Sequence, residues 1–139
     1  MNIVLLLSDW KINSLSINRK DDVSDKRESV SLDVKSSFDF GDHEFRIYFD
    51  LKITNADCDI TANAEYKFGV SNGVIDEKFK NSSFPIVNAP AIAYPYLRAA
   101  IANITLQSGL RPIMLPSINF SKIAEEKAKS EVAKTQSTT

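Results

Sequence analysis

The chain has 139 residues, which suffice for one compact domain with a hydrophobic core but not for two. Its net charge of −1 argues against a nucleic-acid-binding protein that relies on phosphate contacts. Cys58 is the only cysteine and His43 the only histidine, so an intrachain disulfide is excluded and a Cys/His metal site is hard to assemble.

The N-terminal apolar run extends from Ile3 to Leu7 and is ended by Ser8 and Asp9. A signal peptide needs about 7–15 apolar residues after a basic start, and a membrane-spanning helix needs about 20. Neither pattern is present. We interpret the run as the lead-in to a first, buried strand and expect a cytoplasmic protein without membrane insertion.

Two strands are predicted before the middle of the chain. Residues 10–19 mix β-branched and polar residues and indicate a strand with an irregularity near Ser14. A charged loop follows at residues 20–28. Val30, Leu32 and Val34 then alternate with polar residues, which is typical of a half-buried strand.

Two clearer strands follow at residues 44–53 and 58–70, where large apolar side chains alternate with charged or polar ones. A short polar link at residues 55–57 joins them, so the pattern predicts an antiparallel hairpin. The small side chains of Ala62 and Ala64 leave room for a helix above the sheet. The dipeptide Asn72-Gly73 ends the fourth strand.

The next predicted element is a helix over residues 94–108. Pro90 and Pro95 mark its start, because proline lacks an N–H and is tolerated in a first turn. Gly109 stands where a left-handed residue would end it. A last helix is predicted from Asn119, a plausible N-cap, to about residue 134. Its apolar anchors are few, so we expect it to be short, loosely packed or frayed.

Strands grouped before helices indicate an α+β fold. We expect a four-stranded antiparallel sheet followed by a long helix and a shorter C-terminal helix. The chain would form a single domain over residues 1–139, with the sheet at about 3–75, helices at about 90–134 and a polar tail at 135–139.

The long helix is apolar on two sides. Leu97, Ile101 and Ile104 lie on one side, which can cover the sheet. A helix that is apolar on two faces has to bury both, so the other side predicts a contact with another subunit. Asn103 would fix the register of that contact by paired hydrogen bonds. The candidate interface residues are Tyr96, Ala99, Ala100, Asn103 and Leu106.

The loop between the two helices is unusually apolar. Loops are normally polar because their backbone faces water. An apolar loop therefore predicts a surface that a partner buries at least part of the time. Its large apolar residues are Leu110, Ile113, Met114, Leu115 and Ile118.

No motif for catalysis or nucleotide binding occurs in the chain. His43 is better explained as a solvated residue beside a turn than as a catalytic base. Asp57 and Asp59 flank Cys58, but two carboxylates fall short of the roughly six oxygens that a hard cation prefers. We therefore expect neither an enzyme nor a cofactor or metal site.

The segment AYPYLRAAIANITLQSG, followed by a short loop and LPSINF, resembles the C-terminal half of SecB, a family of bacterial protein-export chaperones. That family has an aromatic-Pro-Tyr helix start, a helix ended by glycine, and a Pro-x-Asn-Phe start to its last helix. The matching positions are Pro95, Tyr96, Gly109, Pro116, Asn119 and Phe120. The strands at residues 28–37, 43–54 and 60–75 are similar to family strands, so the resemblance covers about residues 10–126.

This resemblance implies a homotetramer, built as a dimer of dimers, that holds unfolded polypeptides in long apolar grooves without ATP. Periodic apolar strand residues such as Leu32 are more often part of the core, and that interpretation stays open. Carried over to this sequence, the client-binding residues are Val30, Leu32, Val34, Leu110, Ile113, Met114, Leu115, Phe120 and Ile123.

The resemblance leaves three functional alternatives. In exporting members, acidic residues on the exposed sheet face contact the motor SecA, and Asp59 and Glu65 are the candidates here, although Lys67 lies on the same face. The family also includes dedicated chaperones that protect an antitoxin of a toxin–antitoxin pair. We expect a holder of unfolded clients that keeps them soluble and competent for export or for a partner, with the dedicated antitoxin chaperone as the alternative. A structural subunit with one permanent partner chain is the third alternative.

Overall fold

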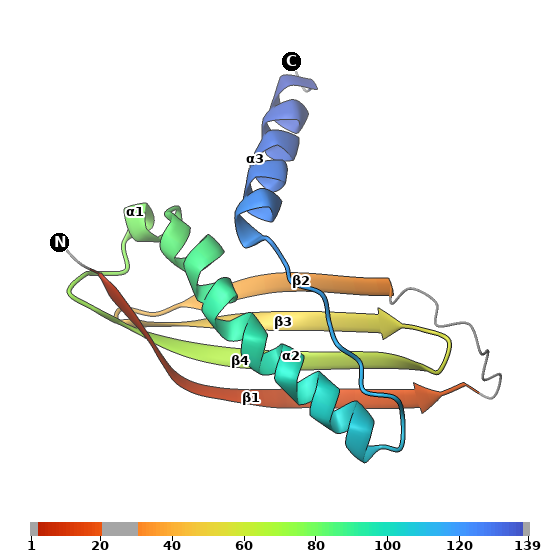
Figure 1. Cartoon of the computed structure of the whole chain (residues 1–139). Coiled ribbons are helices and arrows are strands. Elements are labelled where there is room, and N and C mark those ends of the chain that lie inside the picture. Colours follow the sequence, from red (N-terminus) through yellow and green to blue (C-terminus); the bar gives the residue numbers. More distant parts are fainter. Residues whose placement is uncertain (1–2, 21–30, 138–139) are drawn as a thin grey trace.

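The computed structural model describes residues 3–20 and 31–137, with side chains described up to residue 129. Four strands form one antiparallel sheet in the spatial order β1-β4-β3-β2 (Figure 1). Helices follow the strands along the chain, so the α+β prediction is confirmed. The strands are β1 (Val4–Arg19), β2 (Ser31–Phe40), β3 (Glu44–Thr54) and β4 (Cys58–Ser71).

The predicted hairpin is the pair β3–β4, whose register places Ile53 opposite Ile60. The side-chain oxygen of Asn55 accepts hydrogen bonds from the backbone N–H groups of Asp57 and Cys58, each at 2.9 Å. This turn lets the alternating apolar residues of both strands share one buried face. Cys58 is part of that face.

Strand β1 is longer than predicted and lies at an edge of the sheet. Its register shifts between Leu7 and Asp9 and again between Ile12 and Ser14, so the expected irregularity near Ser14 is confirmed. The expectation of a buried N-terminal strand is wrong. Side chains alternate between the two faces of a strand, and Leu6, on the uncovered face, is 65% exposed.

Four helical segments follow β4. The first two were not predicted. Asp76 caps the first of them by accepting a hydrogen bond from the Phe79 N–H at 2.8 Å. Phe79 is buried, stacks on Phe84 and meets Phe45 edge-on. The segments are α1 (Glu77–Lys80), the π-helical turn η1 (Phe84–Asn88), α2 (Ala89–Gln107) and α3 (Phe120–Ser137).

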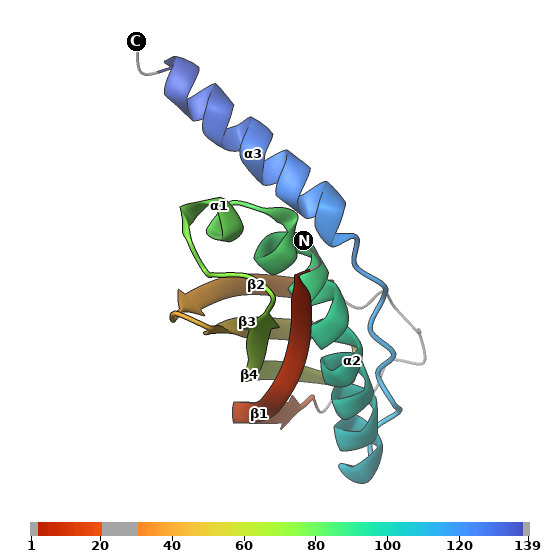
Figure 2. The same cartoon turned by 90° about the vertical axis from the view of Figure 1, so that its left-hand side faces the viewer.

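Helix α2 crosses the sheet obliquely and covers one of its faces (Figures 1 and 2). It begins at Ala89, so Pro95 lies inside the helix and its prediction as a helix start is wrong. The prediction for Gly109 is confirmed: its φ is 78°, and the N–H groups of Gly109 and Leu110 donate to the carbonyls of Leu106 and Thr105. This is a Schellman cap.

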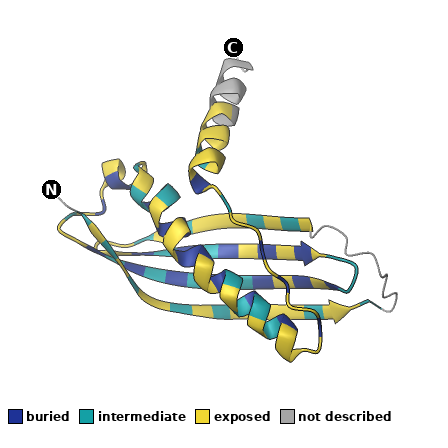
Figure 3. Ribbon diagram, viewed as in Figure 1, coloured by how far each residue is buried: buried dark blue, intermediate teal, exposed yellow. Residues whose placement is uncertain are grey.

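The core lies between the sheet and α2, where buried residues concentrate on β3, β4 and the inner side of the helix (Figure 3). Leu97 and Ile101 are fully buried there, and Ile104 is half-buried. The predicted helix face that covers the sheet is therefore confirmed.

Helix α3 begins at the predicted cap, where the Asn119 side-chain oxygen accepts a hydrogen bond from the Lys122 N–H at 3.0 Å. Phe120 is buried against Phe49 and Tyr94. Beyond it the helix projects away from the sheet (Figures 1 and 2), and its 18 residues make it longer than expected. No helix in the described ranges is both long and apolar enough to cross a membrane.

Candidate binding groove

An apolar hollow of about 720 Å³, here called the groove, opens between strand β2, the segment that links α1 to α2, and the first turns of α3. Polar and charged side chains, among them Lys80, Glu125 and Lys127, also line it. Its large apolar lining residues are Phe38, Phe40, Ile86, Val87, Phe120 and Ile123.

The floor of the groove follows from the position of β2. The register pairs Leu32 with Ile53 and Phe40 with Phe45, both buried, so the even-numbered residues of β2 face the helical side. The apolar residues among them are only half-buried, because β2 is an edge strand while α2 contacts β1 and β4. The apolar row along β2 is therefore left partly uncovered. This row consists of Leu32, Val34, Phe38 and Phe40.

Aromatic contacts fix one end of the floor. Phe38 and Phe40 stack with ring centroids 5.9 Å apart, and Phe40 contacts the core ring of Phe45 at 5.7 Å. The Lys80 ammonium lies 5.7 Å from the centroid of Phe40 and also pairs with Glu77. Because contacts with the core hold these rings in place, they form an ordered apolar surface against which a bound polypeptide can pack.

The first turn of α3 supplies the opposite wall. Phe120 anchors the helix in the core, and Ile123, one turn later, is 50% exposed on the groove side. Both were predicted as client-binding residues, and the structure brings them together in one hollow. Of the predicted strand residues, Leu32 and Val34 lie on the same apolar row as Phe38 and Phe40 but do not line the groove, and Val30 falls outside the described residues.

The apolar loop, residues 110–119, runs back beside α2 across the covered face of the sheet and is called the strap (Figures 1 and 2). Leu110, Ile113 and Leu115 are buried in the core, so the expectation that they are exposed is wrong. Met114, between them, is 66% exposed. The strap fills the space that α2 leaves above the sheet, which is why its composition is apolar.

Side-chain hydrogen bonds also hold the strap. The Ile113 N–H donates to the Thr105 hydroxyl at 2.9 Å, and the Tyr94 hydroxyl donates to the Pro116 carbonyl at 2.6 Å. Burial raises the pKa of Tyr94, which keeps this hydroxyl protonated as a donor. Arg111 donates two hydrogen bonds of 3.0 Å to the Asp57 carboxylate, and these bonds lower the pKa of Asp57.

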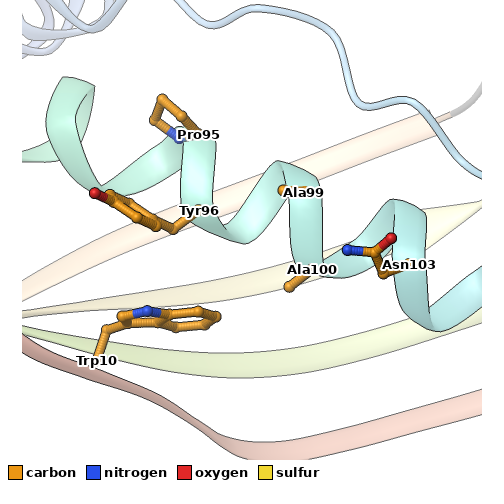
Figure 4. A pocket seen from close by; sticks show the side chains of 6 residues that line it. All are labelled: Trp10, Pro95, Tyr96, Ala99, Ala100 and Asn103. Atoms are coloured by element: carbon orange, nitrogen blue, oxygen red, sulfur yellow. The ribbon is translucent and has the colours of Figure 1, made fainter.

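A second apolar surface lies on the outer side of α2. Pro95, Tyr96, Ala99, Ala100 and Asn103 line a hollow of about 550 Å³ together with Trp10 from β1 (Figure 4). Four of the five predicted interface residues are therefore neighbours around one hollow. The fifth, Leu106, does not line it but is 56% exposed.

Trp10 completes this second surface. It stacks on the buried ring of Tyr66 at 5.5 Å and lies 6.2 Å from the ring of Tyr96. Tyr96 is 48% exposed, so an aromatic and small-residue surface is open to a partner.

The sheet face opposite α2 is mostly polar, and its acidic candidates are ion-paired. Glu65 lies 3.5 Å from the Lys11 ammonium and 3.4 Å from the Arg46 guanidinium, and Asp59 lies 3.2 Å from Lys20. Paired carboxylates present less net negative charge to a basic partner. In the ranges that the structure describes, no group of three or more potential metal ligands lies together.

Sequence reasoning missed several lining residues. Phe38 and Phe40 continue the period-2 alternation of Leu32 and Val34, and this signal could have identified them. Ile86 and Val87 lie in a π turn, for which the sequence offers no periodic signal. Trp10 lies between the two register shifts of β1, which change the alternation on both sides of it.

Comparison with known proteins gives a consistent result. The sequence model of a family described as preprotein translocase subunit SecB matches residues 23–131. The protein-export protein SecB of Magnetococcus marinus is 29% identical over 105 residues, which are 72% of this chain and 65% of that protein. SecB of Agrobacterium fabrum is 31% identical over 100 residues, 58% of this chain and 62% of that protein. The chain thus spans just under two thirds of the length of these relatives.

The fold also has solved counterparts. A SecB-like chaperone of Mycobacterium tuberculosis, in complex with a ChAD peptide from an antitoxin, superposes with a TM-score of 0.64 at 12% identity. The superposition covers 82% of this chain and 87% of that one. A protein of unknown function from Streptococcus agalactiae gives a TM-score of 0.56 at 10% identity, over 84% of this chain and all of that one.

Proposed function

The chain belongs to the SecB family, and from this premise we propose that it is a molecular chaperone that holds unfolded polypeptides in the groove without ATP. One observation carries the proposal: an apolar groove of about 720 Å³ beside an edge strand, with half-exposed Ile123 on its wall. Contiguous exposed apolar surface of this kind marks a binding site.

The groove suits clients of varied sequence. Burial of apolar area is non-directional, so it does not require one particular client sequence. Burying one side chain of leucine size contributes about 1.5–3 kcal/mol. The outer edge of β2, which no other described strand covers, offers backbone hydrogen bonds to an extended client segment.

We propose that the outer side of α2 joins subunits into a homotetramer, a dimer of dimers. The hollow around Trp10, Tyr96 and Asn103 is apolar and lined by the small residues Ala99 and Ala100, which permit a close approach of helices. Several grooves in one particle would bind one long client chain at several points and so raise the affinity by effective concentration.

Two client classes fit the groove. Unfolded preproteins are the first, in keeping with the names of the curated relatives. An antitoxin is the second, favoured by the peptide in the structure of the SecB-like relative. Docking to SecA through Asp59 and Glu65 is the weaker part of the proposal, since both carboxylates are ion-paired. Either role would place the protein in the cytoplasm.

The substitution Ile123→Asp tests the groove. A carboxylate on its wall should weaken binding of a permanently unfolded protein, such as reduced and carboxymethylated lysozyme, at least about tenfold, because apolar contact is lost and charge must be desolvated. Met114→Asp tests whether the site extends along the strap. Ser117→Asp, an exposed strap position, is the matched control. Unchanged affinity of the Ile123 variant, in a particle of unchanged size, would refute the groove as the binding site.

A further inference from the structure

The π turn η1 is an unusual element in this fold. The Ala89 N–H donates to the carbonyl of Phe84, five residues earlier, instead of to that of Pro85, four residues earlier. The turn continues directly into α2. π-Helical hydrogen bonding is rare and frequently occurs at functional sites. We therefore expect a nearby residue that produces the turn and an effect of the turn on the groove beside it.

The consequence concerns the groove. Ile86 and Val87, both from the π turn, line it, and α3 contacts η1 on the same side. Pro85 is buried, and Phe84 stacks on Phe79. The turn thus presents two apolar side chains to the groove, while Phe84 and Pro85 pack inward and Asn88 is exposed.

The cause is found in Pro90. In a regular α-helix, residue 90 would donate its N–H to the carbonyl of Ile86, but proline has no N–H, and its ring clashes with the carbonyl four residues earlier. The wider π turn lies at this point of the chain. Consecutive residues of an α-helix are about 100° apart around the axis, so a relaxed, α-helical turn would present different side chains to the groove.

We propose that Pro90 is a positioning residue: it maintains the π turn that directs Ile86 and Val87 into the client groove. This inference rests on the proposed chaperone function. It adds that Pro90, through the π turn, determines which apolar side chains form one wall of the groove. Pro90 is itself buried and is not a lining residue, so its effect on a client is indirect.

The test compares Pro90→Ala with Asn88→Ala. Alanine at position 90 restores the donor and removes the ring clash, whereas alanine at the exposed position 88 raises helix propensity without changing the proline. We expect Pro90→Ala to weaken binding of reduced, carboxymethylated lysozyme at least about fivefold while its melting temperature stays equal or rises. Asn88→Ala should bind like the wild type. If Pro90→Ala only disrupted the fold, both its melting temperature and its affinity for the unfolded protein would fall.

A double-mutant cycle with Ile86→Ala makes the test specific. In the wild-type background this substitution should weaken client binding; in the Pro90→Ala background it should add little, because the side chain has already turned away. Equal effects in both backgrounds would overturn the inference, as would nuclear magnetic resonance contacts that show the π turn intact in the Pro90→Ala protein. Failure of the wild type to bind the unfolded protein would instead refute the proposed function, and this inference with it.

Discussion

Thr105 is a fully buried polar residue whose hydroxyl links two elements. It donates to the carbonyl of Ile101 at 2.8 Å and accepts a hydrogen bond from the Ile113 N–H at 2.9 Å. A buried N–H without an acceptor is costly, so this hydroxyl replaces the water that the strap backbone would otherwise need.

The substitution Thr105→Val should destabilise the protein by about 1–3 kcal/mol, because it leaves the buried Ile113 N–H unsatisfied at nearly constant side-chain volume. The free energy of unfolding in urea measures the effect. Thr61→Val, at an exposed strand position, is the control and should stay within about 0.5 kcal/mol of the wild type. Equal stabilities of the two variants would rule out the role assigned to the hydroxyl.

Single residues with local rules were predictable from the sequence, and those with tertiary roles were not. Gly109 and Asn119 follow capping rules that depend on a few neighbouring residues, and both lie where expected. Thr105 was not identified, because its partner Ile113 is positioned only by the folded strap. Trp10 was missed as part of the outer surface for the same reason: its contact with Tyr96 joins β1 to α2.

At the scale of elements, the apolar composition of the strap was identified correctly, but the exposure predicted for its residues was wrong. Its composition is apolar, as the sequence indicated, but the alternation of buried Ile113 and Leu115 with exposed Met114 depends on the space beside α2. That space exists because α2 crosses the four-stranded sheet obliquely and leaves part of its face uncovered. The alternation of apolar and polar residues along the strands predicted burial more reliably, because the apolar face of a sheet is buried regardless of which element packs on it.

The ion pair between Asp57 and Arg111 fastens the strap to the β3–β4 turn. The hydrogen bonds from Arg111 lower the pKa of Asp57 below its ordinary value of 3.8. A lowered folded-state pKa contributes stability that is present above the unfolded value and is lost as the pH falls through the folded value. Asp57→Asn should therefore be less stable than the wild type at neutral pH. The difference should begin to shrink as the pH falls below about 4, the ordinary pKa of an aspartate, and should disappear only below the lowered pKa of the folded state.

Unfolding in urea between pH 7 and pH 3 measures this effect. Asp59→Asn is the matched control, because its pair with Lys20 is more exposed and such pairs contribute little. A stability difference for Asp57→Asn that persists unchanged at pH 3 would contradict the assignment of the ion pair.

At the scale of the whole molecule, the sheet and its order relative to the helices could be predicted, and the groove only in part. Alternation identified β2, β3 and β4, and grouping of strands before helices gave the α+β class. The groove combines β2, η1 and α3, which are distant in sequence, so its full lining required the fold. The unpredicted α1 and η1 are short and lack the periodicity that reveals longer helices.

Assembly into a tetramer is a property of the whole molecule. Asn103→Lys introduces a charge into the apolar hollow on the outer side of α2, and burial of an unpaired charge is costly. We expect the tetramer to dissociate into smaller particles while each subunit remains folded. Sedimentation velocity measures the particle size and circular dichroism the fold. A persisting tetramer would exclude this helix face as the interface.

The most direct test of the chaperone assignment is size-exclusion chromatography with light scattering, on the protein alone and after a denatured, slowly folding protein is diluted into it. We expect a particle of about four chains that carries the client as a soluble complex and prevents its aggregation. A client that aggregates at the same rate with and without the protein would show that the protein is not a chaperone for unfolded polypeptides.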